Sequence, residues 1–292
     1  MKSTLYWILA IVITLSAAYY QRKTGPTYPK QIDIDVNGTE YSLRMLRSIE
    51  IGSGEEIKLA VKDTSVSARL YYKRLNTSDN YQALDFVYRS KAIDSWLMNR
   101  VFKITEEEGF FTEIPEQPAA GKIQYYFELT DKNGKNTYFE NEPIVIRFKG
   151  AVPSKYLTPH ILLMFIAMLL STLAGLMAIG KHNSFRKYGN ITLIFLLLGG
   201  MILGPVVQYH AFGAAWTGVP LGWDLTDNKT LIAVLFWIWA VLANRKRSRP
   251  GLTILAAFIL LLVYSIPHSM YGSELDYSSG EVVQGIILNF LY

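Results

Sequence analysis

The chain of 292 residues contains no cysteine. This absence excludes disulfides, thiolate nucleophiles, cysteine-ligated zinc, iron–sulfur clusters, covalently attached c-type haem and a lipoprotein anchor. Any metal ligands must therefore be histidine, aspartate, glutamate, tyrosine or backbone oxygen. Histidine is also scarce, with four in the chain, and neither an H-E-x-x-H zinc motif nor a G-x-S-x-G nucleophile elbow is present. No reaction can be named from a motif.

Long hydrophobic segments dominate the second half of the chain. Together with an N-terminal run at 5–20, they lie approximately at 156–179, 191–207, 230–243 and 252–266. Some are short against the ~20 residues that a helix needs to cross a bilayer, so their polar ends should lie among the headgroups. No Lys, Arg, Asp or Glu lies mid-span in the four later segments, which argues against an ion-coupled transporter.

The first segment is either a signal peptide or an uncleaved signal anchor. Ser16, Ala17 and Ala18 form only a weak cleavage site, and bulky Tyr19 and Tyr20 follow it directly. We therefore favour the anchor.

Two short loops between the segments, 181–187 and 244–249, are basic and contain no acid. By the positive-inside rule both are cytoplasmic. Alternation then places 21–155, 208–229 and 267–292 outside, which in a Gram-negative cell is the periplasm. Much of the net charge of +5 lies in these loops, so it reports topology and no nucleic-acid partner is expected. We expect a multi-pass protein of the bacterial inner membrane with a cytoplasmic N-terminus and a periplasmic C-terminus.

The region 28–150 predicts a separate β domain. Residues 122–129 alternate between apolar and mostly polar side chains, as a half-buried strand does. A tight turn at 131–135 follows, where Asn133 and Gly134 tolerate positive φ, and 138–148 then returns. The other strand candidates are 31–36, 41–46, 57–61, 68–74, 100–104 and 110–114, whereas 81–99 is expected to be a loop or short helix. Many short strands between turns favour an all-β immunoglobulin-like or fibronectin type III-like sandwich.

Three of the four histidines, His160, His210 and His268, lie at the ends of different hydrophobic segments and share the predicted outer face. The acidic candidates beside them are Asp224, Glu274 and Asp276. Three neutral imidazoles with one carboxylate suit zinc, copper, iron or manganese, and a b-type haem between His160 and His210 is an alternative. Taken singly, each histidine is more simply explained as an interfacial side chain bonded to a carbonyl or to water.

Asp224 and Asp227 receive different roles in this interpretation. Asp227 comes just before the apolar run at 230–243, so it is predicted to cap that helix and complement its dipole. Asp224 has no such local role and is the better ligand candidate. The Gly- and Trp-rich loop at 208–224 is expected to fold back onto the bundle, either as a structural interfacial loop or as a ligand-lining one.

These observations divide the chain into four expected parts. They are an N-terminal signal anchor at 1–27, a periplasmic β-sandwich at 28–150, a four-helix transmembrane domain at 151–281 and an amphipathic tail at 282–292. The tail is too short to span a bilayer, but its apolar residues form one helical stripe that could lie along the membrane surface.

Several short strings in this sequence carry a family resemblance. They are Thr24–Pro29, Gln117–Lys122, Trp216–Gly218, Asp224–Thr230, Pro267–Ser269 and Gly272–Asp276. In these strings the chain resembles bacterial inner-membrane proteins that combine an exported Ig-like domain with a C-terminal four-helix membrane region. The resemblance implies architecture and no activity.

Two functions stay open at this point. The first is an accessory or interaction subunit that is anchored in the lipid bilayer and binds a periplasmic or membrane protein partner through its sandwich. The second is a metal- or haem-binding membrane enzyme or redox subunit with a histidine and carboxylate site at the periplasmic face.

Overall fold

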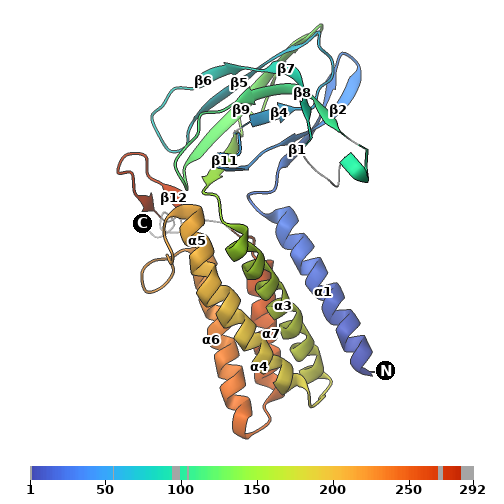
Figure 1. The fold of residues 1–292 in the computed structure, drawn as a ribbon, viewed down its shortest axis with the longest axis vertical. Helices are drawn as coiled ribbons and strands as arrows, with labels where there is room; N and C mark the ends of the chain where they lie inside the picture. The colour runs from blue at the N-terminus through green and yellow to red at the C-terminus, as the bar shows by residue number, and fades with distance from the viewer. Residues whose placement is uncertain (1, 55, 94–98, 104, 269–271, 284–292) are drawn as a thin grey trace. The chain divides into compact units, whose positions relative to one another are not determined.

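A computed structural model describes residues 2–54, 56–93, 99–103, 105–268 and 272–283. The chain forms two compact units. The helical unit contains residues up to Pro26 and the region from Gly150 to Glu274, and the β unit contains 27–149 and 275–281. Figure 1 shows the helices and strands of each unit.

The β unit is built from short antiparallel ladders. Its strands are β1 (Lys30–Val36), β2 (Thr39–Met45), β3 (Ser48–Glu50), β4 (Glu56–Leu59), β5 (Ser67–Arg74), β6 (Gln82–Asp85), β7 (Val87–Ala92), β8 (Glu106–Glu113), β9 (Lys122–Asp131), β10 (Gly134–Tyr138) and β11 (Ile144–Lys149). One sheet has the order β3-β11-β9-β5-β6, with β10 added to β9, and a second has the order β4-β8-β7. β1 and β2 form a separate hairpin. Only the short β3–β11 pairing among these is parallel.

Strand alternation places the core of this unit. Ile123, Tyr125, Phe127 and Leu129 of β9 are fully buried, while the residues between them are half-buried. Burying one such side chain stabilises a fold by roughly 1.5–3 kcal/mol, so this strand contributes strongly to the core. The Tyr125 hydroxyl avoids an unsatisfied buried donor because it donates to the Leu46 carbonyl at 3.0 Å.

Most predicted strands in this region are confirmed, with three corrections. The segment 81–99 contains β6 and β7 where a loop or short helix was expected, while its residues 94–98 lie outside the described part. No strand occurs at 100–103, and residue 104 is not described. The expected single return strand at 138–148 is two strands, β10 and β11, because Phe139 has φ of 68° and Pro143 precedes β11.

Helices form the other unit. They are α1 (Lys2–Thr24), α3 (Ser154–Ile179), α4 (Phe185–Leu196), the π-helical η1 (Leu197–Leu203), α5 (Gly204–Phe212), α6 (Leu225–Lys246) and α7 (Pro250–Ser265). α4, η1 and α5 form one continuous helix. Within the described part of the chain, four helices are long and apolar enough to cross a membrane, as expected for a multi-pass membrane protein, and α7 is a shorter apolar helix. Every predicted hydrophobic segment coincides with a helix, but α6 begins at Leu225, five residues before its predicted start.

Short strands complete the described C-terminal region. They are β12 (Glu274–Leu275) and β13 (Val282–Val283). The predicted helical tail begins at 282, but Val282 and Val283 form a strand, and its residues from 284 onward lie outside the described part.

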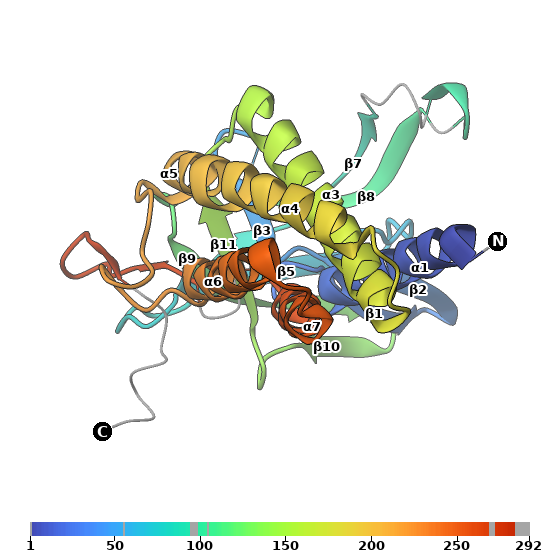
Figure 2. The same ribbon diagram turned by 90° about the horizontal axis from the view of Figure 1, so that it is seen from below.

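The helices surround a core made partly of small residues. α3, α4, α6 and α7 pack as a ring of successive neighbours, and α1 packs against α3 and α7 (Figure 2). A Cβ atom added at Gly175 of α3 would lie 2.7 Å from Cβ of Ala257 in α7, and one at Gly200 of η1 would lie 2.8 Å from Thr230 Cγ2. Small residues allow this close approach where lipid offers helices no hydrophobic driving force to associate.

The direction of each helix gives the helical unit two distinct ends. Tyr6, near the start of α1, packs its ring 6.2 Å from that of His182 in the α3–α4 loop, whereas Gln21 donates to the Tyr264 carbonyl near the end of α7. We call the end with loops 181–187 and 244–249 the basic end. The other, which carries His160, His210 and His268, is the histidine end.

Candidate functional site

The three histidines of the histidine end have separate partners. His160 Nδ1 lies 2.9 Å from the Gly199 carbonyl of η1. The ring of His210 stacks on Tyr156 with centroids 5.4 Å apart, and His268 Nδ1 lies 3.3 Å from Gln21 Nε2. The carbonyl contact of His160 is of the kind that the simpler explanation expects, whereas His210 has an aromatic neighbour and His268 an amide.

The described residues show no arrangement of these side chains that would ligate a metal ion. Across residues 2–268 and 272–283, with their internal gaps, no group of three His, Asp or Glu side chains is placed to hold a metal ion. Asp276 belongs to the β unit, where the hydroxyl and amide of Ser278 donate to it and lower its pKa. Glu274 is half-buried in β12. A role of the predicted ligands in binding zinc, copper, iron, manganese or haem stays a prediction.

Asp224 is the N-cap of α6, so the assignment of the cap to Asp227 was wrong. Its Oδ1 accepts from the backbone amides of Thr226 at 2.8 Å and Asp227 at 3.3 Å. The cause is the early start of the helix at Leu225, which puts Asp224 at the cap position and Asp227 in the first turn. The ligand candidate is therefore occupied by a local structural role.

Asp227 instead ties the loop before α6 to that helix. Its side chain is buried, and Oδ2 accepts from the amide of Thr217 at 2.6 Å, the hydroxyl of Thr217 at 3.2 Å and Gln208 Nε2 at 3.1 Å. Gly218 makes the approach possible, since a Cβ atom there would lie 2.6 Å from Asp227 Cβ. The loop folds back onto the helices, as expected, and this is compatible with both of its expected roles.

Lys229 is a buried cation that the sequence analysis did not single out. Only 4% of the residue is exposed, and Nζ donates to the carbonyls of Ile266 at 2.7 Å and Pro267 at 3.3 Å, just beyond the end of α7. A cation is favourable at a helix C-terminus, where carbonyls lack partners. Its position one residue before the apolar run was the available signal, but the late predicted start of the helix hid it.

The buried charges of the histidine end therefore have backbone groups as their main partners. Asp224 caps α6, Asp227 holds the preceding loop and Lys229 closes the end of α7. Together they join the loop before α6, the start of α6 and the end of α7. This arrangement stabilises the histidine end of the bundle.

A different group of polar side chains lies on the outward side of β5 and β9. Because β5 and β9 are antiparallel, Tyr71 stands opposite Tyr126, and their rings stack with centroids 4.9 Å apart. Tyr81 packs edge-on against Tyr126 at 5.0 Å. All three tyrosines are half-buried. We call this surface the tyrosine face; its residues are Arg69, Tyr71, Lys73, Tyr81, Gln124, Tyr126 and Glu128.

Polar contacts hold the tyrosine face in place. Gln124 Nε2 donates to the Tyr81 hydroxyl at 2.6 Å, and the Tyr71 hydroxyl donates to Glu128 at 2.7 Å. Lys135 Nζ also lies 2.7 Å from Glu128. Partial burial raises the pKa of Glu128, but hydrogen bonds from Lys135 and Tyr71 outweigh it, so the net pKa is lowered and the carboxylate stays ionised. The rings are therefore fixed by a charged and hydrogen-bonded border.

A cleft adjoins the tyrosine face. Its lining includes Lys73, Arg74, Asp79, Asn80 and Gln82. Arg74 pairs with Asp79 at 2.6 Å, which lowers the pKa of that carboxyl mainly through the hydrogen bond. The cleft extends the polar surface next to Tyr81.

Comparisons of the chain with protein-family models, with curated proteins and with solved structures give no match.

Proposed function

We propose that this protein is a multi-pass inner-membrane protein that acts as an interaction subunit, and that its β unit binds a protein partner through the tyrosine face. The observation that carries the proposal is the packing of Tyr71, Tyr81 and Tyr126 against one another on the outward side of a sheet. The partner would be a periplasmic or membrane protein.

The physical reason lies in the properties of tyrosine at interfaces. A tyrosine offers a large amphipathic surface and loses little conformational entropy on binding, because it has only two side-chain torsions. Here the rings are already fixed by Gln124 and Glu128, so less freedom remains to be lost. Arg69, Lys73 and Glu128 surround them with both signs of charge, which suits a polar interface rim.

The simpler explanation is that the tyrosines stabilise only their own sheet. Aromatic pairs across neighbouring strands contribute roughly 0.2–1 kcal/mol each, so such pairs occur without any partner. The two explanations differ in what a truncation removes. If the tyrosines are only structural, truncating one lowers the stability of the protein and leaves partner affinity unchanged. If they form the interface, truncation lowers partner affinity at nearly constant stability.

The β unit would be an immunoglobulin-like sandwich. In that fold one sheet contains strands C, F and G, and the other contains B, E and D. The order β6-β5-β9-β11 corresponds to C′-C-F-G, the order β4-β8-β7 corresponds to B-E-D, and the chain order agrees as well. The cysteine pair that links B and F in antibody domains is absent, and buried Ile57 and Tyr125 occupy these two strands.

The orientation we propose follows from the two basic loops. Both lie at one end of the helices, and basic loops remain in the cytoplasm. The β unit follows the end of α1 that lies opposite, so it would be periplasmic. The C-terminus would be periplasmic too.

Site-specific crosslinking tests the partner proposal in intact membranes. A photoreactive residue replaces Tyr81 in the full-length protein, and a matched control replaces Val87, which is 63% exposed on β7 of the other sheet. We expect a discrete crosslinked protein from position 81 and none from position 87. Crosslinks of equal yield from both positions would refute the proposal.

Truncation of Tyr126, which contacts both Tyr71 and Tyr81, then measures the contribution of this residue to partner binding. Tyr126→Ala should weaken the complex by about 30-fold or more, the ~2 kcal/mol typical of an interface hot spot. Tyr126→Phe keeps the stack with Tyr71 and should bind more tightly than Tyr126→Ala. A loss of thermal stability with unchanged affinity would assign the tyrosines to the sheet alone.

A further inference from the structure

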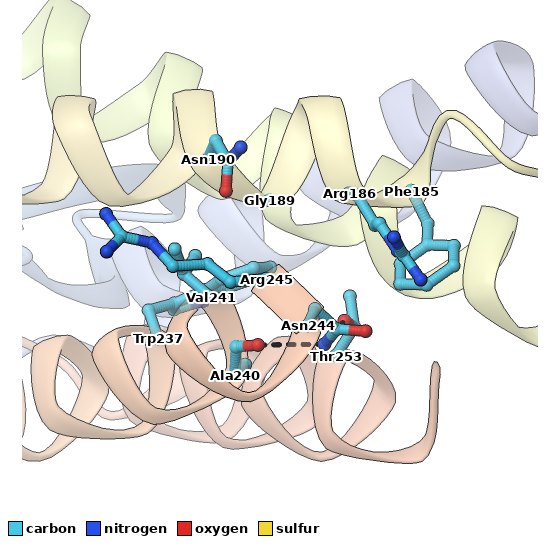
Figure 3. A pocket seen from close by; sticks show the side chains of 10 residues that line it. All are labelled: Phe185, Arg186, Gly189, Asn190, Trp237, Ala240, Val241, Asn244, Arg245 and Thr253. Carbon is cyan, nitrogen blue, oxygen red and sulfur yellow. Dashed lines mark hydrogen bonds between the residues drawn. The ribbon is translucent and has the colours of Figure 1, made fainter. Parts of the chain in front are cut away.

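A polar cavity lies at the basic end of the helical unit, opposite the end that carries His160, His210 and His268. It is enclosed by the start of α4, the end of α6 and the start of α7, and its volume is ≈ 260 Å³ (Figure 3). This is just below the ~300–1,000 Å³ of typical small-molecule sites. The lining side chains that matter here are Arg186, Asn190, Trp237, Asn244, Arg245 and Thr253.

Two arginines border this cavity without a carboxylate to neutralise them. Arg186 lies in the first turn of α4 and Arg245 in the last turn of α6. Among the described residues neither guanidinium forms an ion pair, and Arg186 lies only over the ring of its neighbour Phe185 at 5.9 Å. The adjoining loops contain no Asp or Glu. The cavity therefore has an uncompensated positive charge.

The wall of the cavity contains a buried polar group without a protein partner. Trp237 is fully buried, and its indole N–H has no hydrogen-bond partner in the part of the chain that the structure describes. Gly189 lets α4 approach this ring, since a Cβ atom there would lie 3.0 Å from Trp237 Cζ3. Because this N–H is itself buried, the open volume of the cavity does not reach it, and the guanidinium groups carry the polar recognition.

Hydrogen bonds stabilise the turn between α6 and α7, next to the cavity. The buried Asn244 donates to the Ala240 carbonyl at 2.8 Å and accepts from the Arg249 amide at 2.7 Å. It also lies 3.3 Å from the Thr253 hydroxyl. These bonds fix the α6–α7 connection and with it the position from which Arg245 extends (Figure 3). The site is thus largely formed before any ligand arrives.

We propose that this cavity binds the phosphate group of an anionic ligand. Guanidinium groups match phosphate oxygens in geometry and charge, and the N-terminus of α4 favours an anion through its free amides and dipole. Basic pockets between helices at a membrane surface take the headgroups of anionic phospholipids. A free phosphate offers the same chemistry from water.

Topology alone is the competing explanation of these arginines. The positive-inside rule places basic residues in both loops and requires no cavity. The loops supply a matched control for this reason. Lys187 and Arg247 are exposed members of the same two loops and do not line the cavity.

Native mass spectrometry of the delipidated full-length protein tests the proposal. Phosphatidylglycerol, phosphatidylcholine and inorganic phosphate are titrated separately. The wild type is compared with Arg186→Gln/Arg245→Gln and with the control Lys187→Gln/Arg247→Gln, which removes the same charge. A third variant, Arg186→Lys/Arg245→Lys, keeps the charge and loses the planar fork.

The site is supported, with a lipid headgroup as its ligand, if phosphatidylglycerol binding falls about tenfold or more in the Gln cavity variant and is kept in the control. The same pattern with inorganic phosphate supports it with a free anion. If the Gln cavity variant does not fold, a several-fold loss of phosphatidylglycerol or phosphate binding in the Lys variant supports the site. Equal losses in cavity and control variants, equal binding of both lipids without phosphate binding, or unchanged binding in the folded cavity variants would overturn it.

Discussion

Removal of the Asp227 carboxylate should destabilise the histidine end more than the loss of an ordinary exposed acid. Oδ2 is the acceptor for the Thr217 amide, the Thr217 hydroxyl and Gln208 Nε2. In Asp227→Ala, Gln208 keeps Thr217 Oγ1 as a second acceptor at 2.8 Å. The Thr217 amide loses its acceptor, so it carries most of the cost.

The magnitude follows from these contacts. A hydrogen bond to a charged group contributes about 1.5–3 kcal/mol, and an acid in the first turn of a helix adds about 0.3–1 kcal/mol through the dipole. The sum predicts that Asp227→Ala lowers the free energy of unfolding by about 2–4 kcal/mol. Asp227→Asn keeps an acceptor for Thr217 and loses the charge, so it should cost about half as much.

Equilibrium unfolding in detergent, followed by tryptophan fluorescence, measures this difference. Trp216 and Trp223 lie in the loop that Asp227 holds, so their signal reports its release. Asp33→Ala, an exposed acid of β1, serves as the control and should change stability by less than ~0.5 kcal/mol. If Asp227→Ala matches this control, or if Asp227→Asn is as damaging as Asp227→Ala, the assigned network is incorrect.

Three further predictions concern other contacts. Lys229→Met should lower the free energy of unfolding by about 1–3 kcal/mol because the Ile266 and Pro267 carbonyls lose their donor, and the exposed Lys181→Met should not; equal unfolding curves would contradict this. Gly200→Ala should destabilise by about 1–3 kcal/mol through overpacking against Thr230, whereas Gly251→Ala in α7, with nothing within 4 Å, should be neutral or stabilising in the same thermal melts. Asp63 has its pKa lowered to about 2, chiefly by the Ser65 hydroxyl and then by Asn37, from a usual 3.8. Because its folded-state pKa is depressed, its contribution is present above pH 3.8 and is lost as pH falls through about 2; the stability gap between wild type and Asp63→Ala should therefore close over that window, and a constant gap in acid titrations would refute the assignment.

Most of the secondary structure could be predicted from the local periodicity of apolar residues. The alternation in β9 and the apolar runs of α3 and α6 identify elements directly, since side-chain period follows backbone geometry. β6 and β7 escaped because both are exposed strands at sheet edges, whose polar residues show no buried alternation. A strand was not predicted where neither of its faces is buried against a core.

The roles of the charged residues depended on where a helix begins. A shift of five residues in the start of α6 moved the cap from Asp227 to Asp224 and hid Lys229. Helix ends are the least certain part of a sequence interpretation, because a polar first turn shows no apolar periodicity. The cap geometry decided the assignment.

The sequence by itself determined that apolar segments form membrane-length helices, that the region between the first two contains strands, and that chemistry based on cysteine is excluded. These features depend on composition and on periods of a few residues. Only the tertiary structure decided that His160, His210 and His268 have different partners, that Tyr71, Tyr81 and Tyr126 share one surface, and that Arg186 and Arg245 border one cavity. Each of these depends on which strands pair and which helices become neighbours, and that choice is made by packing between residues far apart in the chain.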